Sequence, residues 1–169
     1  PAAVPNFFIQ DTCYGETSTL TSLYEIPVGK VVSSKWFING ASYNSDSITK
    51  YTFYKSGKHN IGLKLISDNG CESNYFRPIN IKDIPNPRIA PFGNLDLCLG
   101  ETVLFHDSTF INDSIVKSEW KYGNQQLLGK SISIGLDSFN FNGVKLIGTN
   151  KFGCTDSTIK YLTVHPLPK

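Results

Sequence analysis

The stretch VSSKWFI, at residues 32–38, decides the fold, because polar and apolar side chains alternate along it. Successive side chains of an extended chain point to opposite faces, so alternation with a period of two marks a half-buried strand. The pattern recurs 84 positions later as VKSEWKY (116–122). The residues expected to share the tryptophan's face are Val32, Ser34, Trp36 and Ile38 in the first copy and Val116, Ser118, Trp120 and Tyr122 in the second. The sequence therefore predicts a strand centred on a tryptophan that occurs once in each of two copies.

The repetition extends well beyond this strand. CYGET at 13–17 recurs as CLGET at 98–102, and IGLKLISDNGC at 61–71 aligns without a gap with VKLIGTNKFGC at 144–154. An internal repeat of this length is typical of tandem domains. Three prolines in IPNPRIAP (84–91) form a stiff connection between the copies. We therefore expect one domain at 1–84 and a second at 85–169.

The last residues, VHPLPK, repeat the spacing of that connection, since Pro166, Pro168 and Lys169 match Pro85, Pro87 and Arg88. This match leads us to expect a longer protein with further copies.

The pattern of each copy predicts short strands separated by turns that contain Gly and Asn. Further candidate strands in the first copy are 7–10, 17–26, 47–54 and 75–81. Six or seven strands in one copy, with a tryptophan on the third, describe an immunoglobulin-like sandwich. The expected fold class is all-β, with two tandem β-sandwich domains.

The order of motifs resembles that of the polycystic-kidney-disease (PKD) domain: an early Cys-x-Gly, a central Trp-Phe or Trp-x-Tyr-Gly, and a late Gly-Cys before a final strand and a proline. It is more closely similar to the cysteine-bearing variety found in tandem in large secreted proteins of Bacteroidota. The resemblance implies an extracellular β-sandwich, a spacer or adhesive module of surface adhesins, gliding-motility proteins or secreted polysaccharide-degrading enzymes, commonly exported by type IX secretion. The family's central WDFGDG stretch stands here as WFINGA (36–41) and WKYGNQ (120–125), without its aspartates. No metal site is therefore carried over.

Composition agrees with a location outside the cell. The net charge is +2 with charges of both signs interspersed, which argues against nucleic acid as a partner. No apolar run is long enough to span a membrane. Four cysteines at matched positions, two in each copy, are typical of disulfides formed in an oxidising compartment.

Two cysteine pairings compete. Matched positions favour copies that close themselves, through Cys13–Cys71 and Cys98–Cys154, because a repeat must work wherever it stands in an array. However, the two cysteines of a copy lie at opposite ends of a standard immunoglobulin topology, and a disulfide needs close α-carbons. The alternative pairing crosses the copies, joining Cys13 to Cys154 and leaving Cys71 and Cys98 for neighbouring units.

No catalytic, metal or cofactor site is expected. The string His106-Asp107-Ser108 suggests a triad, but adjacent residues of a strand point to opposite faces. Zinc-type spacing of Cys and His is absent from the sequence, and the aspartates are scattered singly.

Aromatic residues are the candidate contacts for a polysaccharide. Trp36 and Trp120 are assigned to the core, because sandwich domains bury a tryptophan on this strand. Exposed candidates are the pairs Tyr75 and Phe76, and Tyr43 and Tyr54.

Four Asp-Ser sequences resemble the Asp-Ser/Thr-apolar acceptor of O-glycosylation in this bacterial phylum. Their serines are Ser47, Ser108, Ser114 and Ser157.

The leading interpretation is a non-catalytic structural and interaction module, two repeats of a surface stalk or adhesin. Its partners are neighbouring repeats of the chain and, at the cell surface, a polysaccharide or another protein. The rival is an accessory carbohydrate-binding module of a secreted enzyme, which predicts the same exposed aromatic face in both copies.

Overall fold

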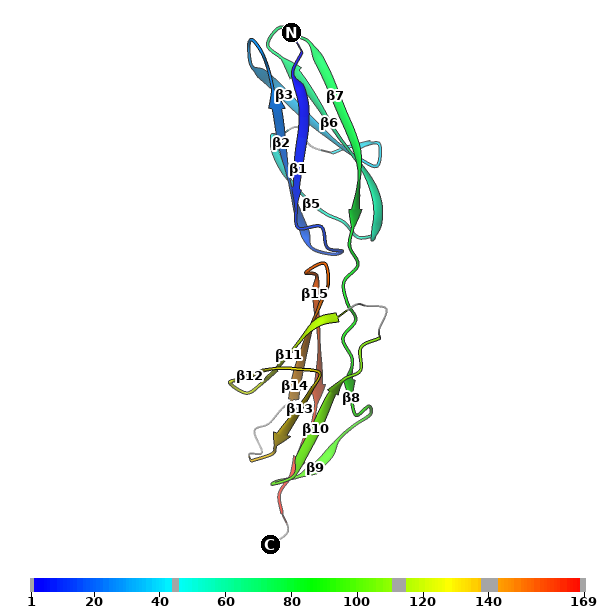
Figure 1. Cartoon of the computed structure of the whole chain (residues 1–169), viewed down its shortest axis with the longest axis vertical. Coiled ribbons are helices and arrows are strands. Elements are labelled where there is room, and N and C mark those ends of the chain that lie inside the picture. Colours follow the sequence, from blue (N-terminus) through cyan, green and yellow to red (C-terminus); the bar gives the residue numbers. More distant parts are fainter. Residues whose placement is uncertain (1, 44–45, 111–114, 138–142, 168–169) are drawn as a thin grey trace. The chain divides into compact units, whose positions relative to one another are not determined.

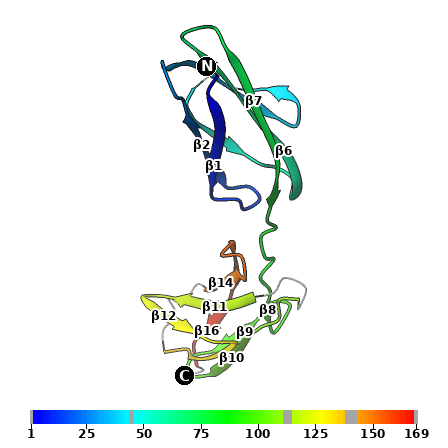
Figure 2. The ribbon, with the colours of Figure 1, turned by 45° about the horizontal axis from the view of Figure 1, so that its top comes forward.

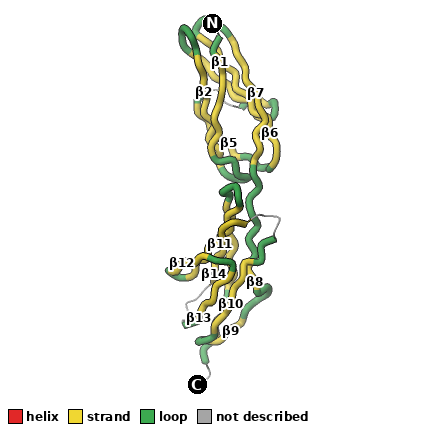
Figure 3. Tube along the Cα trace, viewed as in Figure 1, coloured by secondary structure: helices red, strands yellow, loops and turns green. Residues whose placement is uncertain are grey.

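The computed structural model describes residues 2–43, 46–110, 115–137 and 143–167. It divides into two compact units, Pro1–Asp83 and Ile84–Lys169, called here the N-domain and the C-domain. The boundary falls one residue before the expected one. Figure 3 shows strands joined by loops throughout the parts that it colours, in agreement with the expected all-β class.

The N-domain consists of two antiparallel sheets packed face to face (Figure 1). One sheet has the order β1-β2-β5 and the other has the order β4-β3-β6-β7. The strands are β1 (Val4–Gln10), β2 (Thr17–Glu25), β3 (Val31–Ile38), β4 (Ala41–Ser42), β5 (Ile48–Thr52), β6 (Gly57–Ser67) and β7 (Glu72–Ile81). This arrangement is an immunoglobulin-like sandwich with the tryptophan on the third strand.

The C-domain repeats the arrangement, with sheets in the orders β13-β10-β8 and β12-β11-β14-β15 and a parallel pair, β16-β9. Its strands are β8 (Ile89–Ala90), β9 (Asp96–Cys98), β10 (Thr102–Asp107), β11 (Ile115–Tyr122), β12 (Gln125–Leu128), β13 (Ser131–Gly135), β14 (Gly143–Asn150), β15 (Thr155–Tyr161) and β16 (Thr163–His165).

Each domain has its own core, built around its tryptophan. Trp36 lies opposite Leu63 on β6 and is fully buried with Phe7 and Leu20 from the facing sheet. Trp120 lies opposite Leu146 on β14 and is equally buried, beside Phe105 from β10. The remaining buried apolar residues of the two cores include Phe53, Ile61, Leu65 and Ile81 in the N-domain and Ile132, Ile134, Leu136 and Val144 in the C-domain.

One detail of the tryptophan strand differs from the expected alternation. Ser34, Trp36 and Ile38 are buried as expected, but Val32 is 55% exposed. The register between β3 and β6 shifts between Val31 and Ser33. Such a bulge changes the face to which the preceding side chains point, so Val31 packs on the core in place of Val32.

The C-domain has the same irregularity, between Ile115 and Lys117, and Val116 is correspondingly exposed. The assignment of Val32 and Val116 to the tryptophan's face was therefore wrong.

Candidate functional site

The sequence Cys-x-Gly-Glu forms a tight turn directly before β2 in the N-domain and directly before β10 in the C-domain. In the N-domain, Gly15 has a φ of +75°, a conformation that glycine adopts without steric cost, and the Glu16 amide donates to the Cys13 carbonyl at 3.2 Å. The Gly15 amide donates to the carbonyl of Phe53 at 3.0 Å, which ties the turn to the end of β5. The C-domain repeats all three features with Cys98, Gly100, Glu101 and Leu136.

Backbone hydrogen bonds place this turn beside the final strand of its domain. Cys13 forms a parallel bridge with Lys82, which follows β7, and the Tyr14 amide donates to the Lys82 carbonyl at 2.7 Å. In the C-domain, Cys98 on β9 lies opposite His165 on the parallel strand β16. The first cysteine of each domain therefore lies where the chain leaves that domain.

The second cysteine of each domain lies in the hairpin that precedes the last long strand. In the N-domain, the Cys71 amide donates to the Ser67 side chain at 3.2 Å, while the Ser67 amide donates to the Cys71 carbonyl at 3.0 Å. In the C-domain, the Cys154 amide donates to Oδ1 of Asn150 at 3.1 Å and its carbonyl accepts from the Asn150 amide at 3.0 Å. The two hairpins therefore hold their cysteines in the same backbone frame.

The two cysteines of the N-domain lie at opposite ends of the sandwich. Strand β7 has 10 residues and separates Cys71 from Lys82, the bridge partner of Cys13. At the rise of an extended chain this strand spans about 33 Å, whereas the α-carbons of a disulfide lie about 4.4–6.8 Å apart.

In the C-domain, residues 155–164, which include all of β15, likewise separate Cys154 from His165, the residue opposite Cys98. Figures 1 and 2 show β7 running the length of its sheet from one end to the other.

This separation corrects the expected pairing within each copy. Cys71 and Cys98 carry free thiols, while Cys13 and Cys154 are disulfide-bonded. Neither Cys13–Cys71 nor Cys98–Cys154 is formed, because each pair would have to span the length of its own sandwich. Matched positions in the two copies show that the cysteines serve equivalent roles, but not that the two in one copy lie together.

Both tryptophans are core residues, as expected. The indole nitrogen of Trp36 donates to the carbonyl of Asp46 at 2.8 Å, and that of Trp120 donates to the carbonyl of Gly129 at 2.7 Å. Because both rings are completely buried, they form no platform for a sugar.

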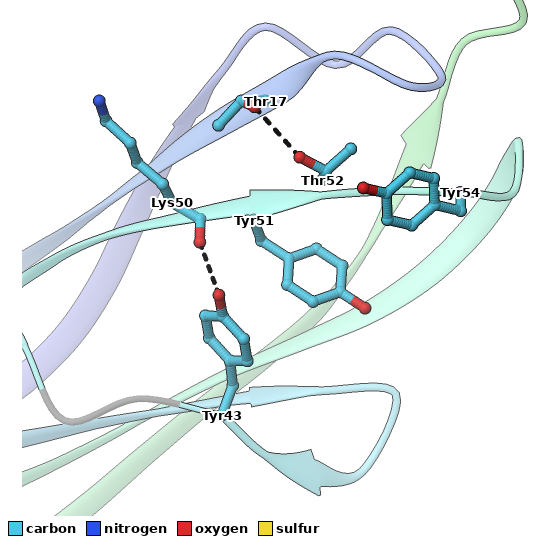
Figure 4. Close-up of a pocket in the computed structure, with 6 residues that line it drawn as sticks. All are labelled: Thr17, Tyr43, Lys50, Tyr51, Thr52 and Tyr54. Atoms are coloured by element: carbon cyan, nitrogen blue, oxygen red, sulfur yellow. Dashed lines mark hydrogen bonds between the residues drawn. The ribbon is translucent and has the colours of Figure 1, made fainter.

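A hollow on the N-domain gathers tyrosines instead (Figure 4). It has a volume of about 290 Å³ and is lined by Thr17, Tyr43, Lys50, Tyr51, Thr52 and Tyr54. The hydroxyl of Tyr43 donates to the carbonyl of Lys50 at 2.9 Å, and the Tyr43 ring packs edge-on against Tyr51 at 5.0 Å. Tyr43 and Tyr54 are 47% and 80% exposed, so both expected contact residues are accessible.

The C-domain does not repeat these tyrosines. The Tyr43 amide donates to the Trp36 carbonyl at 2.9 Å, so Tyr43 lies opposite the tryptophan of its domain. The residue opposite Trp120 in the C-domain is Leu127. Thr17 pairs with Thr52, and its counterpart Thr102 pairs with Gly135, so Thr52 and Gly135 are equivalent. Two residues further on, Tyr54 corresponds to Asp137. The shared aromatic face predicted by the carbohydrate-binding interpretation is therefore absent from these positions.

The other aromatic pair, Tyr75 and Phe76, points to opposite faces of β7. Tyr75 packs against the core, with its ring 5.6 Å from Phe7. Phe76 is 49% exposed and covers Gly62, where an added Cβ would lie 2.1 Å from the Phe76 ring. The Phe76 ring thus occupies the space that a side chain at position 62 would take on this face of the sheet.

The string His106-Asp107-Ser108 does not form a catalytic arrangement. His106 contacts the Ser131 hydroxyl at 2.7 Å, and Ser108 donates to the Arg88 carbonyl at 3.2 Å. Asp107 is buried, and its carboxylate accepts hydrogen bonds from the side chains of Thr109 and Ser118.

Asp107 is instead a structural acid. Burial alone would raise the pKa of Asp107, but the bonds from Ser118 and Thr109, with the charge of Lys130, hold the pKa below its ordinary value.

The described residues contain neither a candidate metal cluster nor a candidate membrane-spanning helix. They contain no group of three or more His, Cys, Asp or Glu side chains placed to hold a metal ion. Nor do they include a helix with the length and apolarity required to cross a membrane.

Three of the four candidate glycosylation serines lie in described segments. Ser108 is half-buried, Ser47 and Ser157 are exposed, and Ser157 lies on β15. Ser114 lies outside the described residues. Glycosylation stays a prediction.

Comparison with known proteins gives structural neighbours of low identity. No protein-family model and no curated protein matches the sequence. The PKD1 domain of Vibrio anguillarum Epp is 20% identical, with a TM-score of 0.44, over 49% of this chain and 96% of that chain. The PKD1 domain of the Vibrio cholerae metalloprotease PrtV is 18% identical, with a TM-score of 0.42, over 48% of this chain and 98% of that chain.

The fibronectin(III)-like modules of Clostridium thermocellum CbhA align over 95% of both chains, with 12% identity and a TM-score of 0.48. These neighbours are of the PKD and fibronectin classes. Their TM-scores lie below 0.5, so they say nothing about what this chain binds.

Proposed function

We propose that this chain is a non-catalytic structural module, consisting of two repeats of an extracellular stalk or adhesin. The observation that supports it most is which residues the two domains share. They share the buried tryptophan, the Cys-x-Gly-Glu turn and the cysteine hairpin, while the exposed tyrosines of one domain are replaced in the other. Repetition of the framework without repetition of a binding face suits a spacer.

An extracellular location is part of the proposal. Disulfide-bonded Cys13 and Cys154 fit an oxidising compartment, because thiols stay reduced in the cytosol. The resemblance to cysteine-bearing PKD-like repeats of Bacteroidota adds a route, type IX secretion, and a setting such as gliding motility or adhesion.

Antibodies raised against the 169-residue chain test the location. We expect them to label intact cells of the organism that carries the gene, or to detect the protein in its culture medium. Labelling that requires permeabilised cells would contradict the proposal.

The tyrosine hollow favours a second candidate, a carbohydrate-binding module. Tyr43 and Tyr54 are exposed beside the hydroxyls of Thr17 and Thr52, and aromatic faces with neighbouring hydroxyls suit sugar rings. Affinity electrophoresis against soluble polysaccharides tests this candidate. Retardation that is lost in Tyr43→Ala/Tyr54→Ala, but kept in the control Tyr161→Ala on the C-domain, would establish it.

A further inference from the structure

We propose that Cys71 and Cys98 are half-sites for disulfides to flanking repeats, so that consecutive domains are cross-linked throughout an array. The inference rests on the proposed function as a repeat of a stalk and names the chemistry of its joints. The occupant of each half-site is the complementary cysteine of another copy of this repeat.

The position of each cysteine within its domain supports the proposal. The bridge between Cys13 and Lys82 is parallel, so the first and last strands of the N-domain run in the same direction. The chain therefore enters this domain at the end that holds Cys71, called here the leading end. It leaves beside Cys13, at the trailing end.

The C-domain has the same polarity. Pro87, at the start of the domain, lies against Gly148, which pairs with Asp156 just after Cys154. The chain leaves after His165, opposite Cys98. Cys154 therefore marks the leading end and Cys98 the trailing end.

The oxidation states follow this polarity. The connection runs from the trailing end of the N-domain to the leading end of the C-domain, and the cysteines at those two ends, Cys13 and Cys154, are the disulfide-bonded ones. The thiols of Cys71 and Cys98, at the outward ends, are free. We infer that the trailing cysteine of each domain forms a disulfide with the leading cysteine of the next domain.

The free cysteines lie in the same backbone frames as the bonded ones. Cys71 matches Cys154 in its hairpin, and Cys98 matches Cys13 in its turn. Cys98 is exposed and Cys71 is partly exposed, so both thiols are accessible to a partner.

The bond forms by thiol–disulfide exchange with an exported disulfide oxidoreductase. A thiolate from one repeat attacks the oxidant's disulfide, and the thiolate of the adjoining repeat displaces the oxidant from the mixed disulfide. The two thiols lose two protons and two electrons in total, and the oxidant is released as a dithiol.

A duplicated chain tests the proposal. Residues 1–168 are continued directly by residues 4–169, so that six residues separate His165 from Phe7 of the second copy, as residues 83–88 separate Lys82 from Ile89. After oxidation by glutathione disulfide, peptide mapping without reduction should find Cys98 of the first copy joined to Cys71 of the second. Free thiols at both positions, in a chain whose Cys13 and Cys154 are oxidised, would overturn the proposal.

A second measurement keeps the test decisive if the duplicated chain misfolds. Cys71→Ser and Cys98→Ser chains of different mass are mixed and oxidised. We expect the heterodimer, joined through Cys98 and Cys71, to exceed both homodimers together severalfold. A statistical mixture would contradict the matched polarity. Neither result bears on surface labelling, so failure here is distinguishable from failure of the extracellular assignment.

Discussion

At the scale of single residues, Trp36 and Trp120 determine whether each domain has a core. Each fills the space between two sheets and donates its indole hydrogen to a loop carbonyl. We expect Trp36→Ala to destabilise the N-domain by about 3–5 kcal/mol, the usual cost of removing a large buried ring. The exposed aromatic Phe8, changed to alanine, is the matched control.

Fluorescence then separates the two domains, because Trp120 is the only tryptophan left in Trp36→Ala. The denaturation curve followed by Trp120 fluorescence should have the same midpoint as the C-domain of the unchanged chain. Circular dichroism should show the N-domain unfolding at a lower denaturant concentration. An unchanged circular dichroism curve would show that Trp36 is not a core residue.

Asp107 gives the C-domain a dependence on pH. Because the pKa of Asp107 is lowered in the folded domain, its contribution to stability is fully present above the unfolded pKa. It is lost as pH falls through the folded pKa. The equivalent position in the N-domain is Ser22, so acid should weaken the C-domain more.

Asp107→Asn should cost the C-domain about 2 kcal/mol at neutral pH, since its hydrogen bonds to a charged group are weakened. The loss of stability as pH falls through the folded pKa of Asp107 should shrink correspondingly. Amide signals of each domain, followed in urea at several pH values, provide the measurement. An equal acid response in the variant would show that other groups cause it.

At the scale of elements, the Cys-x-Gly-Glu turn depends on its glycine. Gly15 and Gly100 have positive φ with open space around them. Alanine there should therefore cost about 1–2 kcal/mol through backbone strain alone. Gly135→Ala is the control, because Gly135 also has room for a methyl group but lacks a positive φ. Equal midpoints for Gly100→Ala and Gly135→Ala in thermal unfolding would refute the role of the turn.

The elements were largely predictable from the sequence, whereas their irregularities were not. Period-two patterns located the tryptophan strand and the buried run Ile61, Leu63 and Leu65. The bulges that turn Val32 and Val116 outward leave no mark in an alternating pattern, since they arise from pairing with a neighbouring strand.

At the scale of the whole molecule, the cysteine pairing could not be read from repeat spacing. Spacing showed that Cys13 matches Cys98 and that Cys71 matches Cys154. Which end of a sandwich each occupies depends on the direction of strands such as β7, and therefore on topology. The sequence did contain a useful signal, because a full-length strand lies between Cys71 and the end of the first copy.

A cross-link over the joint would limit how far the chain extends under load. With a bond from Cys13 to Cys154, we expect pulling on the termini to extend only the residues outside 13–154. After reduction, both domains should unfold in separate steps. Single-molecule force spectroscopy with and without reductant measures this difference. Two full unfolding steps in the oxidised chain would contradict the cross-link.

Peptide mapping of the native chain tests the central claim most directly, that the two cysteines of each repeat serve different joints. Free thiols are alkylated in denaturant, and the chain is then digested without reduction. We predict alkylated Cys71 and Cys98 together with a peptide that joins Cys13 to Cys154. Peptides joining Cys13 to Cys71 and Cys98 to Cys154 would contradict the account.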